Sequence, residues 1–258
     1  PEKVFNLAAQ AGVRHSVENP EIFISTNING FGNILEVSKN NNVQHLIYAS
    51  SSSVYGGNID LPYSEKSNVD KPLSIYAASK KANELLAHTY SHLYSLPSTG
   101  LRFFTVYGPW GRPDMAYFLF TKSILEEKPI NIFNYGNMTR DFTYIHDIVE
   151  SLLKIMDKPP TTFKASKENN ISRNPNEVPH KIFNIGNSTQ VKLLEFIEII
   201  EDALGKKAIK NFLPMQLGDV PSSLADTKLL EEWISFKPSI SIKFGINEFT
   251  KWYKSFYL

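Results

Sequence analysis

The 258-residue sequence predicts an α/β protein built on a parallel sheet. The first observation is that short apolar runs alternate with longer stretches of helical period, which is typical of βαβ units. The second is that these runs have the length and composition of buried strands. A chain of this length also buries a sizeable core, as one large domain or two small ones.

The first half of the chain supplies strands and helices in alternation. The expected strands are 4–9, 45–50 and 101–106, and the expected helices are 20–40 and 76–95. Leu85 and Leu86 fall on the apolar face of the second helix, and Pro97 lies just beyond its end. Gly30 falls inside the first helix, where a glycine indicates close packing against a neighbouring element.

The sequence changes in character after residue 108. It begins with a Pro/Gly-rich loop at 108–114. The elements expected next are a helix around 115–127, a strand at 130–133, a helix from Asp147, a strand at 181–186, a helix near 191–204 and a mixed tail. Residues 157–180 are polar and contain four prolines, so we expect a surface loop there.

The composition excludes several classes of function. The formal net charge is +1 and the basic residues are scattered, so neither nucleic acid nor a membrane surface is expected as a partner. The absence of cysteine excludes disulfides and thiolate chemistry. No apolar stretch reaches the roughly 18 residues of a membrane span, and no signal-peptide pattern opens the sequence, so we expect a cytoplasmic protein. The carboxylates form no cluster with metal-ligand spacing, and no metal is expected.

The sequence contains no glycine-rich phosphate loop. The nearest approach to G-x-G-x-x-G is Gly30-Phe31-Gly32, which has Leu35 where the third glycine belongs. The opening "PEKVFNLAAQAG" reads as the approach to a strand, and we expect that a preceding segment is missing.

Two polar segments point to one chemical site. The run "YASSSSVYG" (48–56) places serines at the end of an expected strand, where parallel sheets bind their ligands. Tyr76 and Lys80, in "YAASK", share one helix face because they are four residues apart. Tyrosine is a poor base at neutral pH because its ordinary pKa is about 10, but a nearby ammonium stabilises the phenolate. Such a pair can remove a hydroxyl proton while hydride leaves the same carbon. By itself Y-x-x-x-K is weak, and an ordinary surface pair stays the alternative.

A set of motifs in fixed order is more specific. They are "LAAQAGVRHSVENP", "TNINGFGNILE", "SSSSVYG", "YAASKKANE", "LRFFTVYGPWGRPDMA", "GNMTRDFTYIHD", "FNIGN" and "LPMQLGDVPSSLAD". Together they closely resemble the extended short-chain dehydrogenase/reductases that act on nucleotide sugars, and among these the UDP-glucuronate 4-epimerases. The resemblance covers essentially the whole chain and begins well inside the family pattern, so the glycine loop and the first strands are expected to be absent.

The resemblance implies NAD as cofactor and a role for each part of the chain. It implies a partial Rossmann-like doubly wound parallel sheet with a smaller C-terminal substrate-binding domain. The truncated NAD-binding domain is expected over 1–108, with segments near 141–156 and 181–187, and the nucleotide-sugar-binding domain over 109–140 and 188–258. Tyr76 resembles the catalytic base, Lys80 the residue that holds the nicotinamide ribose, and Ser51 the catalytic serine. Cofactor contacts are implied for Tyr76 and Lys80 themselves and also for Leu7, Ala8, Ala9, Thr26 and Phe104.

The same resemblance suggests the substrate. Related 4,6-dehydratases carry Asp-Glu where this chain has Ser52-Ser53, and related decarboxylases carry glutamate at Ser53. Ser52, Ser53, Thr105 and Arg112 are therefore candidates to hold the carboxylate of a uronic acid, although Arg112 reads equally well as an ordinary loop arginine. Arg140 resembles the arginine that grips the UDP diphosphate, Asp219 resembles the acid that holds the uridine ribose, and Gln216 matches the uronate epimerases.

Two classes of function stay open at this point. The first is NAD-dependent 4-epimerisation of UDP-glucuronate to UDP-galacturonate through a 4-keto intermediate, in the service of cell-surface polysaccharide synthesis, or the same reaction on another UDP-hexose or UDP-N-acetylhexosamine. The second is a truncated, non-catalytic remnant. The resemblance also implies a homodimer through the helices at 20–40 and 76–95. Without the glycine loop, we expect the chain alone to hold NAD weakly and to dissolve poorly.

Overall fold

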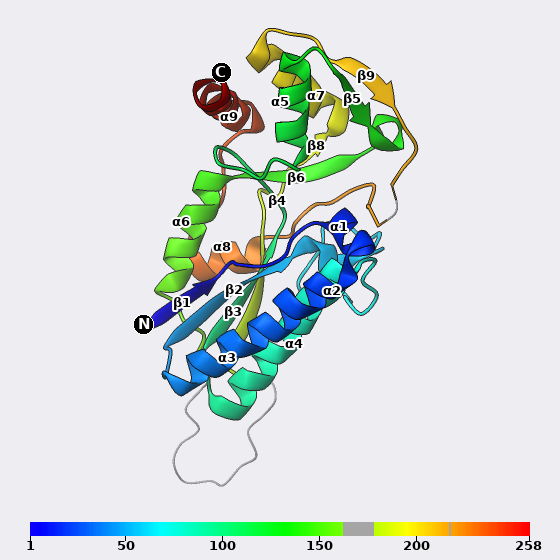
Figure 1. Ribbon diagram of the computed structural model, residues 1–258. Coiled ribbons are helices and arrows are strands. Elements are labelled where there is room, and N and C mark those ends of the chain that lie inside the picture. The colour runs from blue at the N-terminus through cyan, green and yellow to red at the C-terminus, as the bar shows by residue number, and fades with distance from the viewer. Residues whose placement is uncertain (162–177, 217) are drawn as a thin grey trace, which may run out of the picture. The chain divides into compact units, whose positions relative to one another are not determined.

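The computed structural model describes residues 1–161, 178–216 and 218–258, and the chain forms two compact units (Figure 1). Unit 1 comprises Pro1–Ile59, Glu65–Phe103 and Leu152–Asn184. Unit 2 comprises Asp60–Ser64, Phe104–Ser151 and Ile185–Leu258.

A parallel sheet forms the centre of unit 1. Its strands, in spatial order, are β1 (Lys3–Asn6), β2 (His45–Ser51), β3 (Ser98–Phe103) and β7 (His180–Ile185). β1, β2 and β3 run parallel, with Val4 opposite Leu46 and Leu46 opposite Ser98. Strand β2 is almost wholly buried, as its unbroken apolar run predicts. The predicted α/β class with a parallel sheet is confirmed.

Helices cover one face of this sheet. They are α1 (Val13–Glu18), α2 (Pro20–Phe23), a π-helical stretch (Ile24–Asn29), α3 (Gly30–Asn40) and α4 (Ile75–Tyr94). In Figure 1, α3 and α4 run side by side across the strands. Phe31 and Leu35 of α3, Ala87 of α4 and Tyr48 of β2 meet in one buried cluster. The Ser74 hydroxyl begins α4 by accepting a hydrogen bond from the Ala77 N–H at 3.1 Å.

Three expectations about these helices need correction. The helix predicted over 20–40 is interrupted by the π-helical stretch, and the interpretation of Gly30 as a close-packing glycine is wrong. A Cβ built on Gly30 would meet only the Ser25 carbonyl oxygen, at 3.9 Å. Leu86 packs on the buried cluster, whereas the Leu85 side chain is 58% exposed.

Unit 2 contains two small sheets and the remaining helices. One sheet has the order β4 (Thr105–Tyr107), β6 (Thr139–Tyr144), β8 (Gln190–Lys192), and the other pairs β5 (Pro129–Ile132) with β9 (Ile209–Phe212). The helices are α5 (Ala116–Leu125), α6 (Ile145–Met156), α7 (Leu193–Leu204), α8 (Lys228–Ile234) and α9 (Ile242–Tyr257). Along the chain, α6 begins in unit 2 and ends in unit 1.

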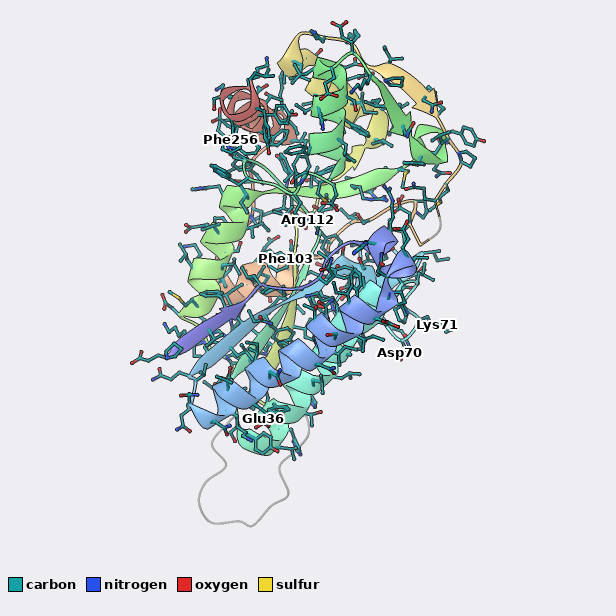
Figure 2. The ribbon with its side chains drawn as sticks, in the orientation of Figure 1. Glu36, Asp70, Lys71, Phe103, Arg112 and Phe256 are labelled. Atoms are coloured by element: carbon teal, nitrogen blue, oxygen red, sulfur yellow. The ribbon has the colours of Figure 1, made fainter. Side chains whose placement is uncertain are left out.

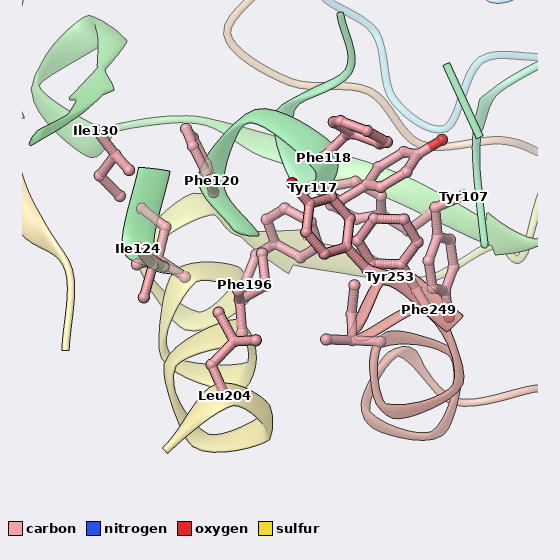
Figure 3. Packing of buried hydrophobic residues seen from close by; sticks show 14 of the residues in the cluster. Tyr107, Tyr117, Phe118, Phe120, Ile124, Ile130, Phe196, Leu204, Phe249 and Tyr253 are labelled. Atoms are coloured by element: carbon pink, nitrogen blue, oxygen red, sulfur yellow. The ribbon is translucent and has the colours of Figure 1, made fainter. Parts of the chain in front are cut away.

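The core of unit 2 is rich in aromatic rings. Figure 3 shows Tyr107, Tyr117, Phe249 and Tyr253 gathered in one cluster. Tyr117 and Phe249 meet edge to face with ring centroids 4.9 Å apart. The prediction of a mixed tail is therefore wrong for its last part, because α9 buries Ile246, Phe249 and Tyr253 at helical spacing against this core.

The strand predicted over 101–106 is two strands in the structure. β3 ends at Phe103 and β4 begins at Thr105, at the point where the chain passes from unit 1 to unit 2. Between them, the Phe104 N–H donates to the Ile185 carbonyl at 3.1 Å. Most of the loop predicted at 157–180 lies outside the described residues. Within the described ranges, no helix combines the length and hydropathy needed to cross a membrane.

Candidate active site

The serine run caps a short helix at the end of β2. Strand β2 ends at Ser51, and a 3-10 helix follows over Ser52–Tyr55. The Ser51 hydroxyl accepts a hydrogen bond from the Ser53 N–H and donates one to the Ser53 hydroxyl, both at 3.1 Å. Ser51 is buried, whereas Ser52 and Ser53 are half-buried. The run therefore presents hydroxyl groups at the carboxyl end of a central parallel strand, where open α/β sheets bind ligands.

The Tyr76–Lys80 pair lies at the start of α4, which packs on β2 and on the 3-10 helix of the serine run. The Lys80 ammonium donates to the Ala49 carbonyl at 2.8 Å, two residues before Ser51. Burial lowers the pKa of Lys80 to about 8. Tyr76 is half-buried, with its ring edge-on to Phe23 at a centroid distance of 6.1 Å. The helix thus holds its basic group directly against the strand that ends in serines.

A cavity of about 230 Å³ lies beside this helix in unit 1. Its lining residues are Asn6, Ala8, Ala9, Thr26, Asn27, Gly30, Phe31, Ile34, Lys80 and Asn83. Four residues predicted to contact the cofactor are among them: Ala8, Ala9, Thr26 and Lys80. Leu7, Tyr76 and Phe104 are not. Leu7 is exposed, and Phe104 packs its ring on Tyr63 in unit 2.

Asn27, which the sequence reasoning missed, organises the wall of this cavity. Its side-chain amide exchanges two hydrogen bonds with the backbone of Gln10, at 2.8 and 3.0 Å, and also donates to the Ser79 hydroxyl at 2.9 Å. The Asn83 amide donates to the Asn27 carbonyl at 2.7 Å. The loop after β1 is therefore tied to the face of α4 that carries Lys80.

The cavity fits the ribose part of a dinucleotide. Alanines and Gly30 line it with little side-chain volume. The Lys80 ammonium and the Thr26 hydroxyl supply polar groups suited to sugar hydroxyls. Small apolar walls with a few directed polar groups are the usual chemistry of a cofactor site.

In unit 2 the structure brings together two residues predicted to bind the nucleotide. The Arg140 guanidinium donates to the Asp219 carboxylate at 2.7 Å, although the residues are 79 positions apart. Arg140 also donates to the Thr139 and Pro221 carbonyls, at 2.8 and 3.3 Å. Both side chains are about one-quarter exposed, at 22% and 26%. The pair presents a planar cation that can bind phosphate oxygens in bidentate fashion.

Gln216 lies next to this pair along the chain. The Asp219 N–H donates to the Gln216 backbone carbonyl at 3.4 Å. The side-chain Oε1 of Gln216 is buried, and no residue that the structure describes donates a hydrogen bond to it. A buried acceptor without a donor is uncommon and is consistent with a ligand group that donates here.

Arg112 and Thr105 occupy more ordinary settings. Arg112 lies in the loop before α5 (Figure 2), and its guanidinium donates to both Asp114 carboxylate oxygens, at 2.9 and 2.6 Å. Its side chain is 47% exposed. Thr105 begins β4 opposite Phe142 of β6. The carboxylate-holding role of both residues stays a prediction.

Asp141 is a second residue that the sequence reasoning missed. It is fully buried and accepts hydrogen bonds from the N–H groups of Asn187, Ser188 and Ala225, at 2.8, 3.0 and 3.0 Å. Burial raises the pKa of Asp141 to about 6, although the three N–H donors act in the opposite direction. Asp141 therefore holds two chain segments beside the strand that carries Arg140.

Asp147 also has a structural role. Its carboxylate accepts from the N–H groups of Ser239 and Ile240, at 3.0 and 2.9 Å. Nowhere in the described ranges do three histidine, aspartate or glutamate side chains gather in a way that could hold a metal ion.

The fold and these two groups of residues define a class of protein, the nucleotide-dependent enzymes with a parallel sheet and a Tyr-Lys pair. Residues 1–186 match the model of the NAD dependent epimerase/dehydratase family, and the chain belongs to this family. The resemblance inferred from the motifs is thereby confirmed, with NAD as the family's cofactor.

Within this family, several relatives have similar sequences over nearly the whole of this chain. The chain is 55% identical over 257 residues to "Protein CapI" of Staphylococcus aureus, covering 100% of this chain and 77% of that protein. It is 46% identical to the "Probable UDP-glucuronate 4-epimerase" of Rhizobium meliloti, covering 100% of this chain and 76% of the relative. It is 48% identical to "UDP-glucuronate 4-epimerase 4" of Arabidopsis thaliana, covering 98% of this chain and 58% of the relative.

Solved structures of proteins that bind UDP-glucuronic acid and NAD are also similar to this chain. The UDP-glucuronic acid 4-epimerase of Bacillus cereus, in complex with UDP-glucuronic acid and NAD, superposes with a TM-score of 0.87 at 33% identity. The superposition covers 99% of this chain and 76% of that one. MoeE5 in complex with UDP-glucuronic acid and NAD superposes with a TM-score of 0.85 at 28% identity, covering 98% of this chain and 79% of that one.

Proposed function

We propose that this protein interconverts UDP-glucuronate and UDP-galacturonate by NAD-dependent epimerisation at C4. The observation that carries the proposal is the anchoring of Lys80 on Ala49, which holds the Tyr-Lys face of α4 beside the serine-bearing end of β2. The similarity to the epimerases of Rhizobium meliloti, Arabidopsis thaliana and Bacillus cereus supports this substrate.

The residues of unit 1 divide the chemistry among them. Tyr76, as phenolate, takes the proton from the sugar O4, and the Lys80 ammonium stabilises the phenolate charge. The Ser51 hydroxyl, rotated from Ser53 toward the sugar, donates a hydrogen bond to the same oxygen and so orients it. Ala8, Ala9, Thr26 and Lys80 at the unit 1 cavity would hold NAD, and the bound cofactor would supply reversible hydride transfer at C4 of the sugar. Tyr76 then returns the proton to O4, and the enzyme is again in its starting protonation state.

The serine side chains at positions 52 and 53 favour epimerisation over elimination and over decarboxylation. Elimination of a C6 hydroxyl group needs an acid and a base near C5 and C6, and Ser52 and Ser53 provide neither. A 4-keto uronate is a β-keto acid that loses carbon dioxide readily. Hydrogen bonds from Ser52 and Ser53 would hold the carboxylate in an orientation that slows this loss.

Unit 2 supplies the nucleotide contacts in this proposal. Arg140 binds the diphosphate, and Asp219 accepts hydrogen bonds from the uridine ribose hydroxyls. The buried Gln216 Oε1 would then accept a hydrogen bond from the nucleotide. The assignment of unit 1 to the cofactor and of unit 2 to the nucleotide sugar rests on these residues.

A homodimer and a cytoplasmic location belong to the same proposal. The helices α2, α3 and α4 expose a set of large apolar side chains in unit 1: Ile22, Val37, Leu85, Leu93 and Tyr94. Burying such a set against a second copy would remove apolar area from water. The cytoplasmic location is proposed on the sequence pattern alone.

Proton NMR tests the reaction directly. The chain is incubated with UDP-glucuronate and NAD, and the Tyr76→Phe variant serves as the control. UDP-galacturonate from the unaltered chain but not from the variant is the expected result. UDP-xylose as the main product would instead indicate a decarboxylase. Turnover of UDP-glucose or UDP-N-acetylglucosamine alone would overturn the choice of a uronate. No turnover, together with no NAD binding in calorimetry, would favour the non-catalytic remnant.

A further inference from the structure

A buried ion pair lies directly behind the serine run, and none of the roles above uses it. The Glu84 carboxylate of α4 accepts two hydrogen bonds from the Arg102 guanidinium of β3, at 2.8 and 2.9 Å. The two side chains are 1% and 3% exposed. Burial lowers the pKa of Arg102, but the hydrogen bonds and charge of Glu84 raise it overall, so the guanidinium stays charged.

The pair extends to both sides of the serine run. On one side, the Ser50 hydroxyl, adjacent to Ser51, donates to Glu84 at 2.7 Å. On the other side, Arg102 donates to the Tyr55 hydroxyl at 3.1 Å, and Tyr55 donates to Asn184 at 2.6 Å. Tyr55 ends the 3-10 helix that contains Ser52 and Ser53. Every polar side chain in this chain of hydrogen bonds is therefore satisfied.

The spacing on α4 relates this pair to the Tyr-Lys pair. Glu84 follows Lys80 by four residues and Tyr76 by eight, so all three project from one face of the helix. Lys80 bonds to the backbone of β2 at Ala49, and Glu84 bonds to the next residue along the same strand, Ser50. Two consecutive turns of α4 are thus fixed to two consecutive residues of β2.

The energetics argue against a purely stabilising role. Desolvation of two charges offsets most of their attraction, and apolar replacements of buried pairs are often neutral or stabilising. A network with defined partners, by contrast, selects one register of helix on strand. We propose that Glu84 and Arg102 are positioning residues that hold the Tyr76–Lys80 face of α4 in register with the serine run. The inference deepens the proposed function, on which its catalytic consequence rests.

The test replaces the pair without changing net charge. Glu84→Met with Arg102→Met removes the network, and Arg102→Lys keeps the charge but loses the two-point contact and the bond to Tyr55. The control is Glu201→Met with Lys210→Met, which removes a second buried carboxylate, 1% exposed, and the less exposed of its two lysine partners in unit 2. Urea unfolding establishes that each variant is folded.

The first readout is the titration of Lys80, followed by NMR with lysine labelled at Cε, and it needs no enzymatic activity. The signal is assigned with Lys80→Met. In the unaltered chain burial holds the pKa of Lys80 at about 8. We expect it to rise by at least one pH unit in the double variant, and to rise detectably in Arg102→Lys, because the ammonium leaves Ala49. An unchanged titration in both folded variants overturns the inference.

The second readout is the division between kcat and KM for UDP-glucuronate. Misplacement of the base by about 1 Å costs roughly 100-fold in rate, so kcat should fall by about that factor while KM changes little. The control pair should leave both constants unchanged. A loss of kcat without movement of the Lys80 titration contradicts positioning. If the unaltered chain does not turn over UDP-glucuronate, the proposed function is refuted. The Lys80 titration then still shows whether Glu84 and Arg102 hold α4 in register with β2.

Discussion

At the residue scale, Lys80 shows that a charged group can be held in the protein interior at an energetic cost. The side chain is 4% exposed and has the Ala49 carbonyl as its hydrogen-bond acceptor, so its charged form has lost most of its hydration. Burial accordingly lowers the pKa of Lys80 to about 8 from an ordinary 10.5. An ammonium poised to titrate close to neutral pH is suited to share charge with a neighbouring phenolate.

The cost of burying the Lys80 ammonium should be visible in the pH dependence of the free energy of unfolding. Between pH 8 and 10.5 the unfolded chain binds more protons at Lys80 than the folded chain does, so the free energy of unfolding should rise with pH in that window. The full rise is about 3 kcal/mol. Urea unfolding at pH 7.5 and 10 measures most of this rise. Lys80→Met should lack this contribution, whereas Lys251→Met, at an exposed position, should retain it.

Arg140 and Arg112 differ in what they can offer a ligand. Arg140→Leu removes a cation held between Asp219 and two carbonyls, and we expect KM for UDP-glucuronate to rise about tenfold to 100-fold with little change in kcat. Arg112→Leu removes an exposed arginine that is paired with Asp114. Steady-state kinetics on both variants decides whether Arg112 belongs to the site or is an ordinary loop arginine. Equal KM values for Arg140→Leu and the unaltered chain would remove Arg140 from the site.

At the scale of elements, β6 and the segment after Asp219 form one assembly. The Thr139 N–H donates to the Pro221 carbonyl and the Ser223 N–H to the Thr139 carbonyl, so residues 221–223 run along the strand. Asp141 adds the bond to Ala225. The position of Asp219 beside Arg140 follows from this pairing.

Asp141→Asn should loosen that assembly. An amide presents N–H groups to one of the three backbone donors, so at least one donor loses its acceptor, and we expect a loss of about 1–3 kcal/mol. Chemical denaturation measures it, with the exposed Asp202→Asn as the control. In addition, KM for UDP-glucuronate should rise more than kcat falls. A variant as stable as the unaltered chain would show that Asp141 does not hold the segment.

The contact between β3 and β2 makes a glycine necessary. A Cβ on Gly100 would lie 2.5 Å from the Tyr48 hydroxyl oxygen, which is itself bonded to His180 at 2.9 Å. Gly100→Ala should therefore destabilise unit 1 by about 1–3 kcal/mol. Gly32→Ala is the matched control, because a Cβ there meets nothing within 4 Å, and alanine in a helix should stabilise by about 0.5–1 kcal/mol. Thermal unfolding compares the two, and destabilisation by both would contradict this explanation.

At the scale of the whole molecule, the proposed homodimer predicts a response to charge. Leu85 of α4 is 58% exposed and Val37 of α3 is 59% exposed. Leu85→Glu should convert the dimer to monomers, because an unpaired carboxylate would have to be buried. Sedimentation velocity measures the change. Ile59→Glu, in a loop at 88% exposure, should leave the assembly intact. A monomer without any substitution would refute the dimer.

Much of this architecture could be predicted from local sequence. The strands and α4 are visible as apolar runs and helical periods because packing repeats along the chain. The division of 101–106 into β3 and β4 is not visible, because it follows from which unit each half joins. Glu84, Arg102 and Asp141 were missed for the same reason. Their partners are distant in sequence, and a charged residue in a helix or strand reads as solvent-exposed until those partners are known.

The aromatic cluster of unit 2 has a practical consequence. The sequence contains three tryptophans, and all of them, Trp110, Trp233 and Trp252, belong to unit 2. Trp110 and Trp252 are in contact, with ring centroids 5.3 Å apart. Emission excited selectively in indole therefore reports on unit 2, whereas circular dichroism reports on the helices of both units. Two optical signals recorded on one unlabelled sample would thus reveal whether the units melt together or one after the other.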